Sequence, residues 1–127
     1  MDTRVILVGH CSPDSSYLAI AIKAAKPGAI VERAMDDVAL LAYLEKGASL
    51  LLINRLLDGE YSNSDGVELL GQCRKSHPEI PAMLISNYPE AQARAVAAGA
   101  VQGFGKSQLG SEGTREMLAV VLAGTKL

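Results

Sequence analysis

The side chains of this sequence that are best suited to chemistry follow directly after short apolar runs. They lie in five segments: Gly9-His10-Cys11, Met35-Asp36, Asn54-Arg55, Ser86-Asn87 and Gly105-Lys106. Together these segments offer an imidazole that can titrate near neutral pH, a thiol, an amide, a hydroxyl and an amine. Because short apolar runs are typical of buried strands, the five segments are expected where strands end.

Cys11 is a candidate nucleophile, because a helix N-terminus can hold an oxyanion over a reactive thiolate. Thiol phosphatases place an arginine six residues after the cysteine, whereas this sequence has Tyr17 there. Cys11 and Cys73 fit no metal spacing and are expected to be reduced thiols. His10 lacks the preceding acid of a cobalamin motif, and no aromatic pair is available to hold a flavin. We therefore predict no metal and no cofactor.

Length and charge limit the class of protein. The chain has 127 residues, enough for one core, and one domain is predicted over residues 1–127 with its core at about residues 4–122. A formal net charge of −2 offers no basic surface for nucleic acid. No apolar stretch approaches the roughly 20 residues that span a bilayer, and no signal-peptide core follows Met1. A cytoplasmic protein that binds neither nucleic acid nor membrane is expected.

Apolar runs and amphipathic segments alternate five times along the chain. Strands are expected at residues 4–8, 29–34, 50–53, 80–85 and 101–104, with Pro81 delaying the start of the fourth. A helix is expected after each strand; Ser12 is predicted to cap the first, and Asp36 or Asp37 the second. The last two helices are expected at residues 89–98 and 112–123.

This alternation implies parallel strands joined by right-handed crossovers, with helices on both faces of the sheet. The predicted fold class is α/β. It is a doubly wound, five-stranded parallel sheet of the flavodoxin-like (βα)5 kind with strand order 2-1-3-4-5, whose sites lie beyond the carboxyl ends of the strands.

Several short motifs stand on these elements in a definite order. Asn54 follows the third strand, Asp65-Gly66 opens the third helix, Ser86 follows the fourth strand, and Lys106 comes seven residues after the Gly99 of Ala98-Gly99-Ala100. With these motifs in this order, the chain from about residue 4 to residue 122 resembles the receiver domain (CheY-like) of bacterial response regulators.

The resemblance implies a role for each strand end. In receiver domains an aspartate after the third strand accepts a phosphoryl group, and an acidic pair after the first strand holds Mg²⁺. A Ser or Thr after the fourth strand and a Lys after the fifth contact the phosphoryl oxygens. Ser86 and Lys106 match these last two positions, whereas Asn54 stands at the acceptor position and Gly9 and His10 at the acidic-pair positions.

These differences remove the chemistry of phosphotransfer. An amide oxygen is neutral and forms no stable acyl phosphate, and Mg²⁺ prefers anionic oxygen ligands. With Asn54, Gly9 and His10, no carboxylate is expected at the site. The prediction is a pseudo-receiver of a two-component system that is not an enzyme and serves as a phosphorylation-independent protein interaction module.

Other interpretations stay open at this stage. Lys106 can neutralise the pocket or hydrogen-bond Asn54, and Ser86 can be a strand-end hydroxyl that satisfies a backbone group. The loop after Asn54 is longer than the usual family pattern, and Asp58 within it could fold over Ser86 and Lys106 as a surrogate acceptor in a phosphorelay. A flavodoxin-like ligand-binding domain is the remaining alternative.

The resemblance also implies a partner surface, formed by the fourth helix, the fifth strand and the fifth helix. Arg94, Gly103, Phe104 and Arg115 are the residues predicted for this surface. Many receivers place a switching aromatic residue three positions before the lysine, where this chain has Gly103. A protein partner, or a second copy of the chain in a homodimer, is expected to bind there.

Overall fold

The computed structural model describes residues 2–123, and five strands alternate with five helices in it. The strands are β1 (Arg4–Val8), β2 (Ile30–Ala34), β3 (Leu50–Asn54), β4 (Ala82–Ile85) and β5 (Val101–Phe104). The helices are α1 (Ser12–Ala25), α2 (Asp37–Lys46), α3 (Gly66–Ser76), α4 (Pro89–Ala97) and α5 (Glu112–Ala123), with a 3-10 turn, η1 (Lys106–Gln108), before α5. Residue 1 and residues 124–127, which the single-domain prediction includes, lie outside the described residues.

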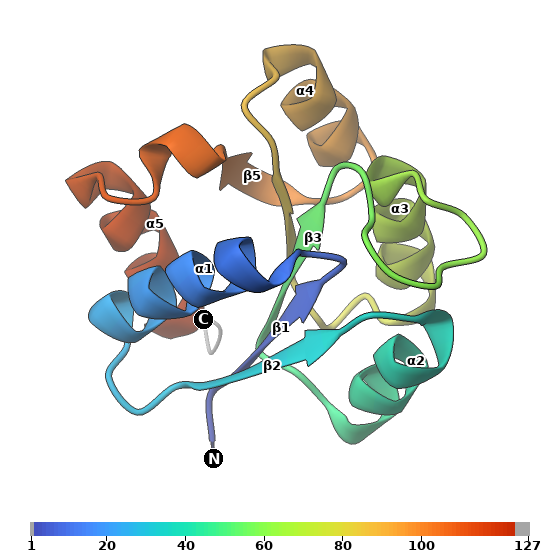
Figure 1. The fold of residues 1–127 in the computed structure, drawn as a ribbon, viewed down its shortest axis with the longest axis horizontal. Coiled ribbons are helices and arrows are strands. Elements are labelled where there is room, and N and C mark those ends of the chain that lie inside the picture. Colours follow the sequence, from blue (N-terminus) through green and yellow to red (C-terminus); the bar gives the residue numbers. More distant parts are fainter. Residues whose placement is uncertain (1, 124–127) are drawn as a thin grey trace.

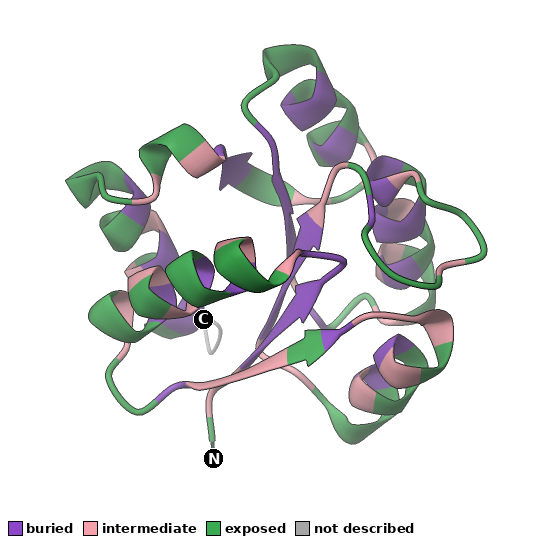
Figure 2. Cartoon of the chain, in the orientation of Figure 1, coloured by how far each residue is buried: buried purple, intermediate pink, exposed green. Residues whose placement is uncertain are grey.

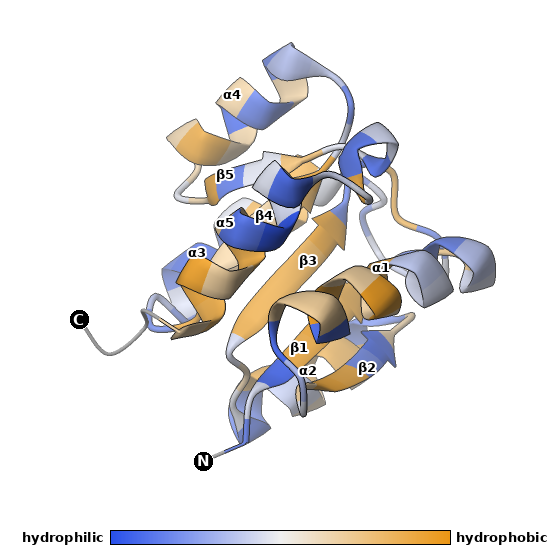
Figure 3. Cartoon of the chain, turned by 90° about the vertical axis from the view of Figure 1, so that its left-hand side faces the viewer, coloured by the Kyte–Doolittle hydropathy of each residue, from blue (hydrophilic) through white to orange (hydrophobic). Residues whose placement is uncertain are grey.

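All five strands form one parallel sheet in the order β2-β1-β3-β4-β5, which confirms the predicted fold class (Figure 1). The runs of β1, β3 and β4 are almost wholly aliphatic because these three strands are central and covered on both faces (Figure 2). In Figure 3, the orange of β1 and β3 marks this apolar centre beneath the more polar outer sides of the helices. No helix within residues 2–123 combines the length and the apolar character that crossing a membrane requires.

Helices cover both faces of the sheet, because alternate strand residues point to opposite sides. Leu18 of α1 and Leu118 of α5 pack with Leu7 and Leu52 on one face. On the other face, α2, α3 and α4 pack over a second cluster that includes Ile6, Leu51 and Leu84, together with Leu40, Leu70 and Ala95 from the helices. As a result, α1 and α5 lie side by side, away from the other three helices (Figure 1).

The predicted helix starts are correct for two helices and displaced for one. Asp36 caps α2 by accepting a hydrogen bond from the Ala39 amide at 2.7 Å, and Asp65 caps α3 through the Val67 amide at 3.0 Å. The assignment of Ser12 as the cap of α1 was wrong, because Cys11 occupies that position without a side-chain hydrogen bond. The Cys11 carbonyl already accepts from the Ser15 amide, so Ser12 belongs to the first turn.

Candidate functional site

The parallel sheet brings its carboxyl ends to one edge, where the predicted site residues gather. Asn54 ends β3, Ser86 follows β4, and Lys106 comes two residues after β5. These three residues line a pocket of about 210 Å³, together with Arg55, Asn87 and Tyr88 among others. We call it the cationic pocket, because Arg55 and Lys106 are its charged lining residues.

Asn54 is held by the backbone of the neighbouring strand. Its Nδ2 donates a hydrogen bond of 3.0 Å to the carbonyl oxygen of Gly9, directly after β1. A carboxylate has no N–H and could not make this contact. The amide at the end of β3 therefore serves a structural role that an aspartate could not fill.

The space beside Gly9 is occupied by the long loop that follows β3. Gly9 has φ +72, a backbone conformation that favours glycine. A Cβ atom there would lie 2.6 Å from Leu57 Cδ2 and 3.0 Å from Leu57 Cα. Leu57 is itself buried, so the position expected for a carboxylate after β1 is closed by an apolar side chain.

His10 is fully buried and its ring is turned toward β3. Nε2 lies 2.9 Å from the Leu52 carbonyl, which can only accept, so this nitrogen carries the proton. Nδ1 has no hydrogen-bond partner within the described residues. Burial lowers the pKa of His10 to about 4, although the hydrogen bond to Leu52 opposes that shift, so the ring is neutral at physiological pH.

Lys106 does not bond Asn54, which was one of the predicted possibilities, but forms an ion pair with Asp14. Its Nζ lies 2.6 Å from Asp14 Oδ2. The hydrogen bond to Lys106 is the main reason that the pKa of the Asp14 carboxyl lies below its usual value. Asp14 was not predicted as a site residue. The packing of α1 beside α5 on one face of the sheet is the signal that could have placed it near Lys106.

Ser86 has the strand-end role that was one of its two interpretations. Its Oγ accepts a hydrogen bond of 3.1 Å from the Tyr88 amide, which lies just before α4. The hydroxyl still has its own proton to donate. Ser86 therefore shapes the turn into α4 and also presents a donor to the cationic pocket.

The loop between Arg55 and Asp65 folds toward β1 and β2. The Asp58 amide donates a hydrogen bond to the Gly9 carbonyl, and the backbones of Glu60 and Asp36 form an isolated parallel β-bridge. The Tyr61 hydroxyl donates to the Ala34 carbonyl. Asp58 consequently lies beside Gly9 and is not among the residues that line the cationic pocket. The role of Asp58 as a surrogate acceptor stays a prediction, since its amide shares the Gly9 carbonyl with Asn54 Nδ2.

Two of the four predicted partner-surface residues are buried, which corrects that prediction. Phe104 packs in the core beneath α5, and Gly103 lies where the pairing of β4 and β5 is irregular, against the Leu84 carbonyl. Arg94 and Arg115 are exposed as expected. Burial of Phe104 leaves no aromatic side chain on this strand that could switch between inner and outer positions.

A buried glutamine, which sequence analysis also missed, joins α4 to the last two strands. Gln92 Nε2 lies 2.9 Å from the Leu84 carbonyl and 3.1 Å from the Ser86 carbonyl. Its Oε1 accepts a hydrogen bond of 3.2 Å from the Gly103 amide. Both ends of this side chain are used, and α4 is fixed to β4 and β5 by hydrogen bonds.

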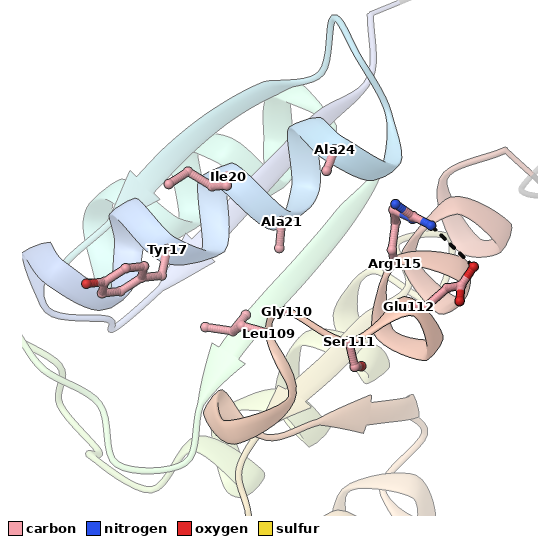
Figure 4. Close-up of a pocket in the computed structure, with 9 residues that line it drawn as sticks. All are labelled: Tyr17, Ile20, Ala21, Ala24, Leu109, Gly110, Ser111, Glu112 and Arg115. Carbon is pink, nitrogen blue, oxygen red and sulfur yellow. Dashed lines mark ion pairs between the residues drawn. The ribbon is translucent and has the colours of Figure 1, made fainter.

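A larger hollow lies away from the strand ends, between α1 and the start of α5 (Figure 4). This α1–α5 groove has a volume of about 490 Å³, and its lining includes Tyr17, Ile20, Leu109, Glu112 and Arg115. Tyr17 and Ile20 are 62% and 67% exposed. Arg115 and Glu112 form an ion pair of 3.5 Å at its side (Figure 4). Within residues 2–123, no three His, Cys, Asp or Glu side chains gather in a way that could hold a metal ion.

The chain has close structural neighbours despite low sequence identity. The signal receiver domain of a DNA-binding response regulator (merR) from Colwellia psychrerythraea 34H matches with a TM-score of 0.77 at 16% identity, over 96% of this chain and 99% of that one. A putative response regulator from Chloroflexus aurantiacus J-10-fl matches with a TM-score of 0.78 at 20% identity, over 97% and 99%. The fold is that of a receiver domain.

NtrX from Brucella abortus is a longer protein with the same fold over part of its length. The match has a TM-score of 0.77 at 23% identity and covers 99% of this chain but 28% of that one. No protein-family model matches the sequence, and no curated protein matches it in sequence. Because one receiver fold can carry different sites, the function has to be argued from the residues at the strand ends.

Proposed function

We propose that this chain is a receiver-type domain of a two-component signalling system that acts by binding protein partners and is not switched by phosphorylation. The observation that carries the proposal is the amide of Asn54, which replaces the acceptor carboxylate and donates to the Gly9 carbonyl. An amide oxygen carries no charge and is a poor nucleophile toward phosphorus.

The surroundings of Asn54 support the same conclusion. Mg²⁺ needs oxygen ligands at short distances, and carboxylates are the usual ones. Leu57 fills the space beside Gly9, and His10 is buried and bonded to β3. Asp14 is the acid nearest to Lys106, and its carboxylate is already paired with that ammonium group.

The partner surface that we propose is the exposed part of α4, β5 and α5. Arg94 on α4 and Arg115 on α5 are exposed, and so are Val96 and Val101. Arginine is enriched at interfaces because its guanidinium makes several hydrogen bonds and packs on apolar surfaces. The hydrogen bonds of Gln92 fix α4 against β5, and this contact supports a surface that does not depend on a switching event.

Intact-mass measurement tests the covalent part of the proposal. The purified chain is incubated with Mg²⁺ and acetyl phosphate, in parallel with a conventional receiver as a positive control. We expect the control to gain a phosphoryl group and this chain to keep its mass. A gained phosphoryl group would overturn the proposal, and an Asp14→Asn variant would then show whether Asp14 is the acceptor.

Binding measurements test the partner surface. Arg94→Glu, Arg115→Glu and Asn54→Ala variants are compared with the wild type for self-association by sedimentation velocity and for capture of a native partner. We expect an arginine variant to lose the complex and Asn54→Ala to keep it. Loss of the complex in Asn54→Ala alone would place recognition at the strand ends and contradict the proposed surface.

A further inference from the structure

A separate pocket lies between α1 and β2, which is an edge strand of the sheet (Figure 1). It shares no lining residue with the cationic pocket or with the α1–α5 groove. Its volume is about 260 Å³. We call it the α1–β2 pocket, and its polar lining consists of three serine hydroxyls and two cations: Ser12, Ser15, Ser16, Lys23 and Arg33.

The charge of the α1–β2 pocket is positive. Lys23 and Arg33 are its charged lining residues, and no acidic side chain of residues 2–123 lines it. Both cations are exposed, and neither forms an ion pair within the described residues. Because cations in one pocket repel each other and raise the local potential, their placement favours an anionic ligand.

The acid next to Arg33 in sequence faces away from the pocket. Glu32 precedes Arg33 in β2, and successive side chains of a strand point to opposite faces of the sheet. The Glu32 carboxylate pairs with Arg4 at 2.8 Å and accepts a hydrogen bond from Tyr43 of α2, on the other face. Asp14 of α1 is also paired, with the ammonium group that follows β5. Neither acid neutralises the pocket by contact.

The other acids at this end of the sheet are bonded elsewhere or lie outside the lining. Asp36 accepts from a backbone amide of α2, and Asp37 accepts from an amide of the loop after β3. Asp58 and Glu60 belong to that loop, and neither pairs with Arg33 within the described residues. These loop acids reduce the positive potential at the Arg33 end of the pocket without occupying it.

Arg33 is already fixed in position by neutral acceptors. Its Nη2 donates to the His10 carbonyl at 3.0 Å and lies 3.7 Å from the Met35 sulfur, and its Nη1 donates to Ser12 Oγ at 3.3 Å. These contacts use three of the five N–H groups of a guanidinium and leave two for a ligand. A guanidinium that is held in this way loses little side-chain entropy when it binds an oxyanion.

The polar residues of α1 form one line along the pocket. Ser12, Ser16, Ala19 and Lys23 follow one another at intervals of three or four residues, which places them on one side of the helix. At about 1.5 Å per residue, the Cα atoms of Ser12 and Lys23 are roughly 16 Å apart, although a helical side chain points back toward the N-terminus. Because Arg33 is bonded to Ser12, the two cations lie toward opposite ends of the pocket. This spacing suits two anionic groups better than one.

The volume limits the size of the ligand. About 260 Å³ corresponds to roughly nine water molecules at about 30 Å³ each, or to an organic molecule of about ten non-hydrogen atoms. Dicarboxylates with roughly four to six carbons combine this size with two charges. A pocket below the usual range of about 300–1,000 Å³ is too small for a nucleotide or a larger cofactor.

We propose that the α1–β2 pocket reversibly binds a small organic dianion with two carboxylates. One carboxylate is bound by Arg33 and the Ser12 hydroxyl, whose proton is free because its oxygen accepts from Arg33, and the other by Lys23. No covalent bond forms. This inference goes beyond the proposed function, and either one can fail without the other, because the pocket has no residue in common with the surface formed by α4, β5 and α5.

A titration with glutarate, a five-carbon dicarboxylate, tests the inference. Backbone amide shifts of the ¹⁵N-labelled chain are followed near neutral pH at constant ionic strength. We expect saturable shifts confined to residues 12–23 and 31–33, with half-saturation at roughly 1 mM because both cations are exposed. Shifts that do not saturate or that are spread over the surface would overturn the proposal. Saturable shifts confined to residues 54–56, 86–88 and 106–107 would place the dianion in the cationic pocket and would also overturn it.

Two further anions test the requirement for two separated charges. Acetate offers one carboxylate and should bind roughly tenfold more weakly than glutarate, since it can engage one cation at a time. Malonate has both carboxylates too close together to reach both ends of the pocket and should bind several-fold more weakly than glutarate. Equal affinity for acetate and glutarate, or for malonate and glutarate, would contradict the two-ended arrangement.

Variants test the two cations. Arg33→Gln should weaken glutarate binding by roughly tenfold, and Lys23→Gln by about fivefold, because water screens an exposed ammonium more than a fixed guanidinium. Lys26→Gln is the matched control, since it removes the same charge just after α1 and outside the lining, and it should change the affinity less than twofold. Equal weakening in all three variants would indicate attraction to net charge alone and would overturn the site.

Thermal unfolding without ligand checks that the variants are folded, because Arg33→Gln also removes the hydrogen bond to the His10 carbonyl. If that variant does not fold, Lys23→Gln and Lys26→Gln still decide the question. With the wild type, saturating glutarate should raise the midpoint of unfolding, and acetate at the same ionic strength should not. An equal rise with both anions would contradict specific binding.

Discussion

The two halves of the sheet's carboxyl edge differ in what fills them. Beside β1 and β3, the Gly9 carbonyl accepts from both Asn54 and Asp58, Leu57 covers Gly9, and His10 is buried. Beside β4 and β5, Ser86 and Lys106 still face an open pocket with Arg55. The first half is a packed, hydrogen-bonded piece of core, whereas the second remains accessible to a ligand.

This difference shows at which strand ends the residues of this chain depart from those of the receivers that it resembles. At the positions where the resembled family has its metal ligands and acceptor, this chain has Gly9, covered by Leu57, and Asn54, whose amide bonds the Gly9 carbonyl. The half that would hold the phosphoryl oxygens keeps its hydroxyl and its amine. Stability is expected to depend more strongly on the first half than on the second, and four substitutions or conditions test this division.

The largest effect is expected for Gly9→Ala. The new Cβ atom meets Leu57 and the backbone must keep φ +72, so strain and overpacking together should cost about 3 kcal/mol in the free energy of unfolding. Gly28→Ala is the matched control, since Gly28 has φ +92 but nothing within 4 Å of a Cβ atom, and it should cost only about 1 kcal/mol. Urea unfolding measures both. Equal costs would mean that Leu57 does not block the space beside Gly9.

The next effect is a loss of stability in mild acid, caused by His10. Its folded pKa of about 4 lies below the ordinary value of 6.5, so the unfolded chain takes up the proton first. Stability should be unaffected above pH 6.5 and fall by up to roughly 3 kcal/mol as the pH drops toward 4. Asp14, whose pKa is lowered, loses its contribution only at lower pH.

Urea unfolding of the wild type and of His10→Gln at several pH values measures this contribution. Glutamine can still donate to the Leu52 carbonyl but has no charge to gain. The variant should therefore show a flatter dependence between pH 6.5 and 4 than the wild type. A profile as steep as that of the wild type would contradict the burial of an uncharged imidazole.

A smaller loss is expected on the open side, where Gln92 holds α4. Gln92→Leu leaves the Leu84 and Ser86 carbonyls and the Gly103 amide without this partner, which should cost about 2 kcal/mol. Gln102→Leu is the control, because Gln102 is exposed, and it should change stability by less than about 0.5 kcal/mol. Thermal unfolding compares the two. Similar small effects would show that Gln92 does not fix α4.

The smallest effect on stability is expected for the ion pair of Lys106 and Asp14. The two side chains are 36% and 28% exposed, so water screens the pair and its coupling should be about 1 kcal/mol or less. A double-mutant cycle with Lys106→Gln and Asp14→Asn measures it, and added salt should reduce it further. A coupling several times larger would make this pair a structural element of the core, and the division between the halves would be wrong.

The fold was predictable from the sequence because its signals are local. Five aliphatic runs predicted the strands. Of the two candidate caps for the second helix, Asp36 is the one observed, the third helix begins at Asp65-Gly66 as expected, and the fourth strand begins after Pro81. The meeting of Asn54, Ser86 and Lys106 followed from parallel topology alone, since all strands end at one edge.

The details of the site depended on tertiary contacts that no local pattern encodes. The position of Leu57 over Gly9 is set by how the loop folds back on β1 and β2. The pairing of Asp14 with Lys106 depends on two helices that are distant in sequence. Phe104 was assigned to the surface because the resemblance implies a partner face over the fifth strand, whereas in the structure its ring is buried with Leu118 and Leu122 of α5.

Restoring the acceptor tests the central claim most directly. Asn54→Asp is incubated with Mg²⁺ and acetyl phosphate beside a conventional receiver, and intact mass gives the labelled fraction. The new carboxylate would face the Gly9 carbonyl without a hydrogen bond, and in the wild type no three His, Cys, Asp or Glu side chains of the described residues gather in a way that could hold a metal ion. We expect almost no labelling. Labelling as complete as that of the conventional receiver would show that the site still binds Mg²⁺ productively. It would contradict the claim that the ends of β1 and β3 no longer support phosphotransfer.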